Sequence, residues 1–192
     1  YKILLNFAKI FIADRYFFKP KNTKMKKLLF VALCILLYGI QNKVNAQFTN
    51  FTVSNSDLPS DYVSGGVAVD TNNFVWVGTD AGVAKFDGTT WTVYTTTDGL
   101  PSNVIACVAV DVATNTVWVG TEGDGVAKYN GSTWTSYNFA DGLCDNGIHY
   151  IACDNSGTTW FGSWGAGISK FDGTTWTTYN AADGFPDDQG AL

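Results

Sequence analysis

From about residue 60 onward, short runs of β-branched and aromatic residues alternate with clusters of Gly, Asn, Asp, Ser and Thr. In the middle of the chain this pattern predicts four successive strands, at residues 104–110, 116–120, 125–129 and 134–138. No segment of this region repeats apolar residues with the 3.6-residue period of a helix, so we expect no helices. The pattern is typical of an all-β protein.

The predicted third and fourth strands are joined by Asp or Asn followed by Gly. This dipeptide occurs as Asp87-Gly88, Asn130-Gly131 and Asp172-Gly173. Such dipeptides favour a type I′ turn, in which both central residues adopt a positive φ. We therefore predict three β-hairpins with type I′ turns.

The chain contains three copies of one unit. The sequence Trp-Val-Gly-Thr at 76–79 recurs at 118–121 and, as Trp-Phe-Gly-Ser, at 160–163, which is a period of 42 residues. Three further markers follow in the same order: Phe-Asp-Gly or Tyr-Asn-Gly, then a second Trp, then Asp-Gly-Leu or Asp-Gly-Phe. The repeats span about 60–101, 102–144 and 145–186.

A period of about 40–45 residues with four antiparallel strands is typical of a β-propeller blade. A blade is too thin to bury both of its faces, so it is stable only when other blades stack on it. We expect the tryptophans of the second and fourth strands to form this packing: Trp76, Trp118, Trp160, Trp91, Trp134 and Trp176. The glycine two residues after each second-strand Trp is expected to allow close approach of backbones, at Gly78, Gly120 and Gly162.

Propellers close a ring with about 4–8 blades, whereas residues 47–192 provide about three blades at this period. We therefore expect an incomplete ring, in a fragment of a longer protein whose remaining blades lie downstream. Residues 48–59 resemble the fourth strand and linker at 91–101. We expect this N-terminal strand to complete the last blade by pairing with three C-terminal strands.

The first 46 residues have the composition of a targeting segment. Met25-Lys26-Lys27 precedes the uncharged stretch 28–40, and Val44-Asn45-Ala46 is an A-x-A-like cleavage site. We identify residues 25–46 as a secretory signal peptide and residues 1–24 as upstream sequence from a wrong start. The apolar stretch is short against the ~20 residues of a membrane-spanning helix, which disfavours a permanent signal anchor. The partial propeller at 47–192 is therefore expected in the periplasm, on the cell surface or in the medium.

The charge of residues 47–192 limits the possible partners. They carry three Lys and sixteen Asp or Glu, a formal net charge of −13 at neutral pH. Such a charge repels phosphate groups, so we expect no nucleic acid, and it disfavours an anionic membrane surface. The cysteines of this region are too few for a disulfide framework. We interpret Cys107 and Cys153 as small buried residues, whereas Cys144 lies in a predicted loop.

The order of motifs from Trp76 to Asn103 resembles the two-component regulator propeller repeat. It reads Trp-Val-Gly-Thr, then Gly-Val-Ala-Lys-Phe-Asp-Gly, then Trp-Thr-Val-Tyr-Thr-Thr-Thr-Asp-Gly-Leu-Pro-Ser-Asn. The resemblance covers residues 48–192, and the last copy departs from the pattern at Ser163, Trp164, Cys144 and Phe185. It implies a propeller outside the cytoplasm. Such propellers are periplasmic inputs of hybrid histidine kinases, often responsive to carbohydrates, or parts of secreted or surface proteins with a sorting domain.

Loops at one end of the propeller are the expected place for a ligand. They join the second strand to the third and each repeat to the next. Trp164 replaces the acidic or polar residue of the other copies with a flat ring that suits the C–H face of a sugar. The alternative is that Trp164 packs over the neighbouring blade. The ligand-binding candidates are Trp164, Tyr62, Asp61, Asp80, Asn103, Glu122, Asp124 and Asn146.

Two charged series recur in phase: Lys85, Lys128 and Lys170, and Asp70, Asp111 and Asp154. We interpret them as ion pairs or lysine stems along apolar surface rather than as a functional ring of charges. His149 has no second His to share a metal or a proton, so we interpret it as a polar core residue. No catalytic motif is found, and we expect no metal and no cofactor.

We therefore expect a recognition module rather than an enzyme, with an oligosaccharide or another small ligand as its partner. The alternatives are a structural or adhesive propeller at the cell surface and a propeller enzyme such as a lyase. We expect contact with a membrane only through a downstream segment, and contact with the blades from further C-terminal repeats.

Overall fold

The computed structural model describes residues 49–184. The chain divides into two units, residues 1–49 and 50–192, and the description below concerns the second. The expected signal peptide at 25–46, the segment 1–24, Phe48 and the residues from 185 onward lie outside the described residues. In the part that is described, no helix has the length and apolar character needed to cross a membrane.

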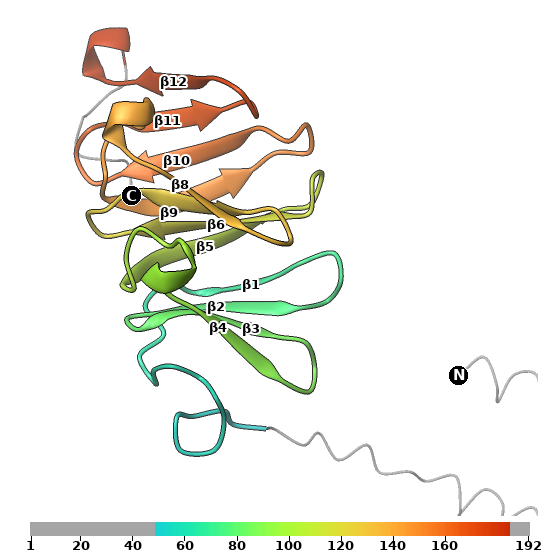
Figure 1. Ribbon diagram of the computed structural model, residues 1–192. Coiled ribbons are helices and arrows are strands. Elements are labelled where there is room, and N and C mark those ends of the chain that lie inside the picture. The colour runs from blue at the N-terminus through green and yellow to red at the C-terminus, as the bar shows by residue number, and fades with distance from the viewer. Residues whose placement is uncertain (1–48, 185–192) are drawn as a thin grey trace, which may run out of the picture. The chain divides into compact units, whose positions relative to one another are not determined.

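The described chain folds into three four-stranded antiparallel sheets, which lie side by side as blades 1, 2 and 3 (Figure 1). Blade 1 consists of β1 (Val67–Val69), β2 (Val75–Thr79), β3 (Gly82–Phe86) and β4 (Trp91–Tyr94). Blade 2 consists of β5 (Ile105–Asp111), β6 (Thr116–Thr121), β7 (Val126–Tyr129) and β8 (Trp134–Tyr137). Blade 3 consists of β9 (Ile148–Cys153), β10 (Thr159–Ser163), β11 (Ile168–Phe171) and β12 (Trp176–Tyr179).

The strands of each blade are hydrogen-bonded in chain order, so every connection inside a blade is a hairpin. The strands of blade 2 begin and end within one residue of the predicted positions. The all-β fold of propeller blades is thus confirmed, and the three blades do not close a ring. The innermost strands are neighbours, because β5 contacts both β1 of the preceding blade and β9 of the next.

The linkers contain three single-turn 3₁₀ helices that the hydrophobic pattern did not predict. They are η1 (Thr96–Asp98), η2 (Phe139–Asp141) and η3 (Ala181–Asp183). Each has a capping box: at η1, the Thr95 hydroxyl accepts from the N–H of Thr97, and the Asp98 carboxylate accepts from the N–H of Thr95 at 2.8 Å. A three-residue helix is too short to produce a detectable period, so here the signal is the Asp-Gly pair that ends it.

The hairpins between third and fourth strands do not have type I′ turns. Among the described residues of these turns only the glycines have a positive φ, for example 98° at Gly88. The Asp87 carboxylate instead accepts hydrogen bonds from the N–H groups of Thr89 and Thr90, at 2.8 and 2.7 Å. The type I′ prediction is wrong. The Asp87 side chain stabilises a hairpin loop that is longer than the two-residue loop of a type I′ turn.

Aromatic side chains hold blade 1 against blade 2. Trp76 of β2 is 1% exposed and stacks on Tyr94 of its own blade, with ring centroids 5.8 Å apart. It also contacts Tyr129 and Trp134 of blade 2, at 5.4 and 6.2 Å. Burial of several large rings in one cluster contributes both hydrophobic and edge-to-face stabilisation.

The same contacts recur between blades 2 and 3. Trp118 lies 5.8 Å from Tyr137 of its own blade and contacts Phe171 and Trp176 of blade 3, at 5.7 and 6.4 Å. On blade 3, Trp160 stacks on Tyr179 at 6.0 Å. The predicted packing between blades is therefore seen for Trp76, Trp118, Trp134 and Trp176, whereas the ring contacts of Trp91 and Trp160 lie outside the two interfaces.

Glycines allow the inner strands to approach each other. A Cβ at Gly78 would lie 2.7 Å from the Ile105 side chain of the next blade. A Cβ at Gly120 would lie 2.7 Å from the carbonyl oxygen of Ile148. Real Cβ atoms do not approach other atoms so closely, so both glycines serve the close approach that was predicted.

The N-terminal segment of the described region follows the linker pattern. The Thr52 N–H donates to the Asn55 side chain at 2.7 Å, as Thr95 does to Asp98 in η1, and Leu58 is buried. Phe51 contacts Phe86 and Trp91 at 5.1 and 5.4 Å. It thus lies on blade 1 as Tyr94 lies on blade 2. Residues 49–51 form no strand, since no other described strand pairs with them.

Candidate functional site

The loops that follow second strands and the linkers between blades lie at the same end of the blades, as predicted (Figure 1). Two backbone hydrogen bonds join them. The Gly125 N–H donates to the Asn146 carbonyl at 2.8 Å, and the Asp80 N–H donates to the Tyr62 carbonyl at 3.4 Å. At this end the short loops of blades 1 and 2 are therefore each held against a linker.

The candidate residues fall into three groups at this end. Tyr62 lies beside Asp80 through the hydrogen bond above, and the loop of Glu122 and Asp124 is held to Asn146 in the same way. Trp164 forms the third group with His149 of the same blade, since their ring centroids are 5.3 Å apart. The candidates thus do not converge on a single point.

Three candidates have side-chain oxygens that already bind the backbone. The Asn103 Oδ1 accepts from the Thr96 N–H at 2.9 Å. The Asn146 Oδ1 accepts from the N–H of Phe139 at 2.8 Å, and Asp61 accepts from the N–H of Val53 at 2.8 Å. The two asparagines therefore cap 3₁₀ helices. Asp80, Glu122 and Asp124 are exposed.

Trp164 is the candidate whose geometry best suits a ligand. Its side chain is 69% exposed, and its ring contact is with His149 of its own blade. Among the described residues the Trp164 ring has no aromatic contact with blade 2, the one described neighbour of blade 3. A large exposed aromatic ring on a rigid loop is a common feature of binding surfaces.

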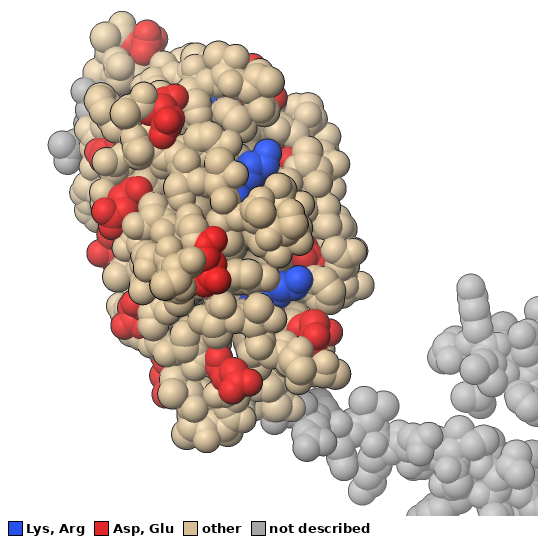
Figure 2. Space-filling model, viewed as in Figure 1, with Lys and Arg blue, Asp and Glu red and all other residues tan. Residues whose placement is uncertain are grey.

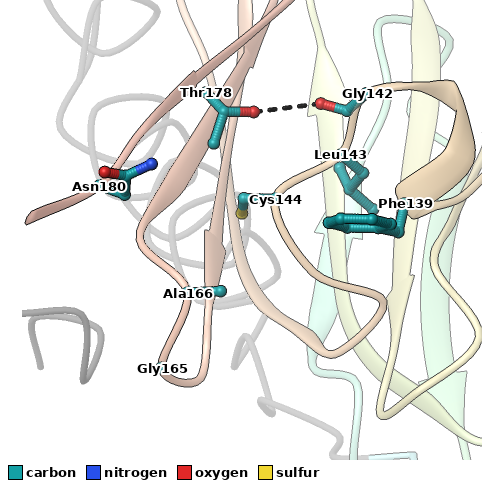
Figure 3. Close-up of a pocket in the computed structure, with 8 residues that line it drawn as sticks. All are labelled: Phe139, Gly142, Leu143, Cys144, Gly165, Ala166, Thr178 and Asn180. Atoms are coloured by element: carbon teal, nitrogen blue, oxygen red, sulfur yellow. Dashed lines mark hydrogen bonds between the residues drawn. The ribbon is translucent and has the colours of Figure 1, made fainter. Parts of the chain in front are cut away.

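A cavity of about 550 Å³ opens next to this loop, between blade 3 and the linker that precedes it (Figure 3). Figure 3 shows the Phe139 ring on one side of the cavity and the Asn180 carboxamide on the other. The Thr178 hydroxyl donates to the Gly142 carbonyl across it at 3.2 Å. The lining residues are Phe139, Gly142, Leu143, Cys144, Gly165, Ala166, Thr178 and Asn180.

No pattern in the sequence predicted this cavity. Its most conspicuous member is Phe139, which is 67% exposed on η2. The equivalent first residues of η1 and η3 are Thr96 and Ala181. A comparison of the three copies at this position would have identified Phe139 as a large apolar residue where the other linkers have small ones.

Part of the departure of the third copy from the pattern has a structural reason. Cys144 stands where the preceding linker has Pro101, and its N–H donates to the buried Ser169 hydroxyl at 2.7 Å. In blade 2, Ala127 takes the place of Ser169. Proline and alanine offer neither donor nor acceptor here, so the two positions changed together.

Both charged series have structural partners. Each Lys of the third strands lies over the indole of its cross-strand Trp partner: the Lys85 Nζ is 5.4 Å from the Trp76 ring centroid, and the other two pairs repeat this at 5.4 and 5.6 Å. Such cation–π contacts are worth about 0.5–2 kcal/mol. The Asp series stabilises turns, as when Asp70 accepts from the N–H groups of Asn72 and Phe74 at 2.8 and 3.1 Å.

The chemistry of the remaining polar groups gives no reactive site within residues 49–184. Cys107, Cys144 and Cys153 are free, but Cys144 is the buried one and the other two are only partly buried, the reverse of the sequence interpretation, because the linker of Cys144 packs on blade 3. Burial raises the pKa of the Cys107 thiol to about 12, and this thiol donates to the Ile148 carbonyl at 3.5 Å. No group of His, Cys, Asp and Glu in the described region could hold a metal ion. In Figure 2, acidic side chains are spread over the visible face and Lys side chains are few.

Comparisons with known proteins identify the fold. No family model and no curated protein matches the chain. It resembles the extracellular domain of a protein described as a hybrid two-component system from B. thetaiotaomicron, with a TM-score of 0.64, 23% identity, and coverage of 73% of this chain and 21% of that one. It also resembles the extracellular domain of a protein described as a one-component system from the same organism, with a TM-score of 0.52, 20% identity, and coverage of 64% and 19%.

The chain spans about a fifth of the length of these two solved structures. At such identities the likeness concerns the fold alone. The fold is that of extracellular domains of sensor systems, which agrees with the propeller repeat that the motifs resemble.

Proposed function

We propose that the chain is part of an exported, non-catalytic recognition module that binds a carbohydrate-like ligand at the loop end of its blades. The observation that carries the proposal is the 69% exposure of Trp164 at this end. A sugar ring packs its C–H face on such an indole while its hydroxyls bond to neighbouring polar groups. The fold shared with extracellular sensor domains supports a role in sensing.

The charge of the molecule narrows the class of ligand. A formal net charge of −13 over residues 47–192 disfavours polyanions such as nucleic acids and phosphorylated ligands. Neutral oligosaccharides are not repelled. In this proposal, binding of the ligand is transmitted through the longer sensor protein to which the blades belong.

The test is a change of the aromatic surface in the full-length protein. Trp164→Ala should weaken binding to neutral oligosaccharides on a glycan array by at least about tenfold, or about 1.4 kcal/mol. Trp164→Phe, the matched control, should retain most of the binding because it keeps a flat ring. Unchanged binding by Trp164→Ala contradicts the proposal. An array that stays blank for the wild type favours the alternative of a structural or adhesive propeller.

We further propose that a repeat of the same kind packs on the free face of blade 3. Trp160 and Tyr179 stack there as Trp76 and Tyr94 stack on the face that receives blade 2. In the full-length protein, the amides of β10 should then exchange hydrogen as slowly as those of β6. Fast exchange in β10 would argue against a covering blade.

A further inference from the structure

The cavity between η2 and β12 lies beside Trp164, but its walls are formed by other residues. Gly165 and Ala166, which follow Trp164, form one edge, and η2 forms the opposite one. We infer that this cavity binds one ring of a neutral sugar, with Phe139 as the stacking surface. This inference rests on the proposed function and adds a second subsite to it.

The first argument comes from comparing the copies inside the chain. Ala81, Asp124 and Ala166 are equivalent, because each donates its N–H to the hydroxyl that precedes the loop, at 3.1, 3.0 and 3.0 Å. By the same alignment Trp164 stands at the position of Glu122. The third copy thus shares its alanine with blade 1 and differs from both other copies at Trp164, which stands beside the cavity where they have Asp80 and Glu122.

The same pattern holds on the other wall. Phe139 begins η2, where η1 and η3 begin with Thr96 and Ala181. An exposed phenylalanine contributes nothing to the blade packing that the repeats share, since Thr and Ala serve at the equivalent positions. Phe139 in the wall and Trp164 beside it are two large aromatic residues that the equivalent positions of the other copies lack, which indicates selection for a ligand rather than for the fold.

The chemistry of the lining selects a neutral, polyhydroxylated ligand. All eight lining residues are uncharged in a strongly acidic molecule, so the cavity provides no counter-ion for an anion or a cation. One wall presents the Phe139 ring, and the other presents the Thr178 hydroxyl and the Asn180 carboxamide. The Asn180 oxygen accepts from the Ala182 N–H at 2.8 Å, which leaves the amide N–H₂ to donate to a hydroxyl.

The walls are held in place without a ligand. The Thr178 hydroxyl ties β12 to Gly142, and the Cys144 N–H binds Ser169 at the back of the cavity. Both η2 and η3 have complete capping boxes. A preformed site loses little conformational entropy when a small ring binds. The volume of about 550 Å³ lies within the ~300–1,000 Å³ typical of small-molecule sites.

The test uses substitutions that the chain itself already contains at equivalent positions, so they should not disturb folding. Phe139→Thr copies Thr96 and removes the stacking ring, and Ala166→Asp copies Asp124 and brings a carboxylate to the cavity. Thr96→Ala, which copies Ala181 in another linker, is the matched control. Binding of the methyl glycosides of glucose, galactose, mannose and xylose to the full-length protein is measured by calorimetry, with glucuronic acid as the charged analogue.

We expect Phe139→Thr and Ala166→Asp each to weaken binding of the preferred glycoside at least tenfold, whereas Thr96→Ala leaves it unchanged. Glucuronic acid should bind more weakly than the neutral glycoside. If Trp164→Ala abolishes binding while both cavity variants bind like the wild type, the proposed function stands and the cavity inference is wrong. If the cavity variants lose binding and Trp164→Ala does not, the cavity inference stands, and the part of the proposed function that places the ligand on Trp164 is wrong. If the wild-type protein binds none of the glycosides, both the proposed function and the cavity inference are wrong.

Discussion

The hydrogen bond between Trp76 and Asp70 provides the sharpest test of how these blades are stabilised. The Trp76 Nε1–H donates to the Asp70 carboxylate at 3.0 Å, and both side chains are buried, at 1% and 8% exposure. We consider the variant Trp76→Phe, which keeps an aromatic ring in the interface but removes the donor. Asp70 then loses one of its buried partners.

The expected magnitude has two parts. A hydrogen bond to a charged group contributes about 1.5–3 kcal/mol. The smaller ring also loses contacts with the aromatic rings of blade 2, which we place at about 1–2 kcal/mol because complete truncation of a buried Trp costs about 3–5 kcal/mol. Trp76→Phe should therefore lower the free energy of unfolding by about 2.5–5 kcal/mol.

Trp134→Phe is the matched control in the same aromatic cluster. The Trp134 Nε1 is buried and has no hydrogen-bond partner. Its removal relieves a desolvation cost of about 1–3 kcal/mol, which offsets the loss of ring contacts. We therefore expect this variant to change the free energy of unfolding by less than about 1 kcal/mol, although the same atoms are removed.

The assay is urea unfolding of the purified protein, followed by far-UV circular dichroism and analysed by linear extrapolation. A double-mutant cycle of Trp76→Phe with Asp70→Asn should give a coupling energy of about 1.5–3 kcal/mol, because the carboxamide turns a donor toward the indole. Equal destabilisation by Trp76→Phe and Trp134→Phe, or a coupling energy near zero, would refute the reasoning.

Two further outcomes follow from the turns and loops. The backbone N–H groups of the hairpin turns hold the pKa of Asp87 and of Asp172 below the ordinary value of 3.8. A lowered folded-state pKa contributes stability that is present above the unfolded pKa and lost as the pH falls. The double variant Asp87→Asn/Asp172→Asn, which copies Asn130, should thus lose less stability than the wild type in unfolding measurements below about pH 4; parallel pH profiles would contradict this. Gly125 has a φ of 94°, and a Cβ there would lie 2.2 Å from the Tyr137 carbonyl oxygen, so Gly125→Ala should destabilise by at least about 1–3 kcal/mol in the urea assay. If Gly125→Ala leaves the free energy of unfolding unchanged, the loop that contains Gly125 can move to accommodate the added Cβ.

Features that depend on nearby residues could be predicted from the sequence. The strands of blade 2 and the packing of Trp76 and Trp118 follow from a 42-residue period with β-branched runs between turn residues. The type I′ turns were wrong because the Asp87 side chain, and not the dipeptide alone, determines the loop.

The amino-acid sequence by itself therefore determined the strands, the repeat and the end of the blades where loops gather, because each depends on residues close together in the chain. Only the tertiary structure showed that Asn103 and Asn146 cap helices, and that Phe139 faces Asn180 across a cavity. Each asparagine caps within its own linker, seven residues from its partner, through a loop shape that no periodicity reveals. Phe139 and Asn180 lie on separate segments, and their distance depends on how one blade stacks on the next. No local pattern encodes such a stacking geometry, since it results from the packing of all the rings between the blades.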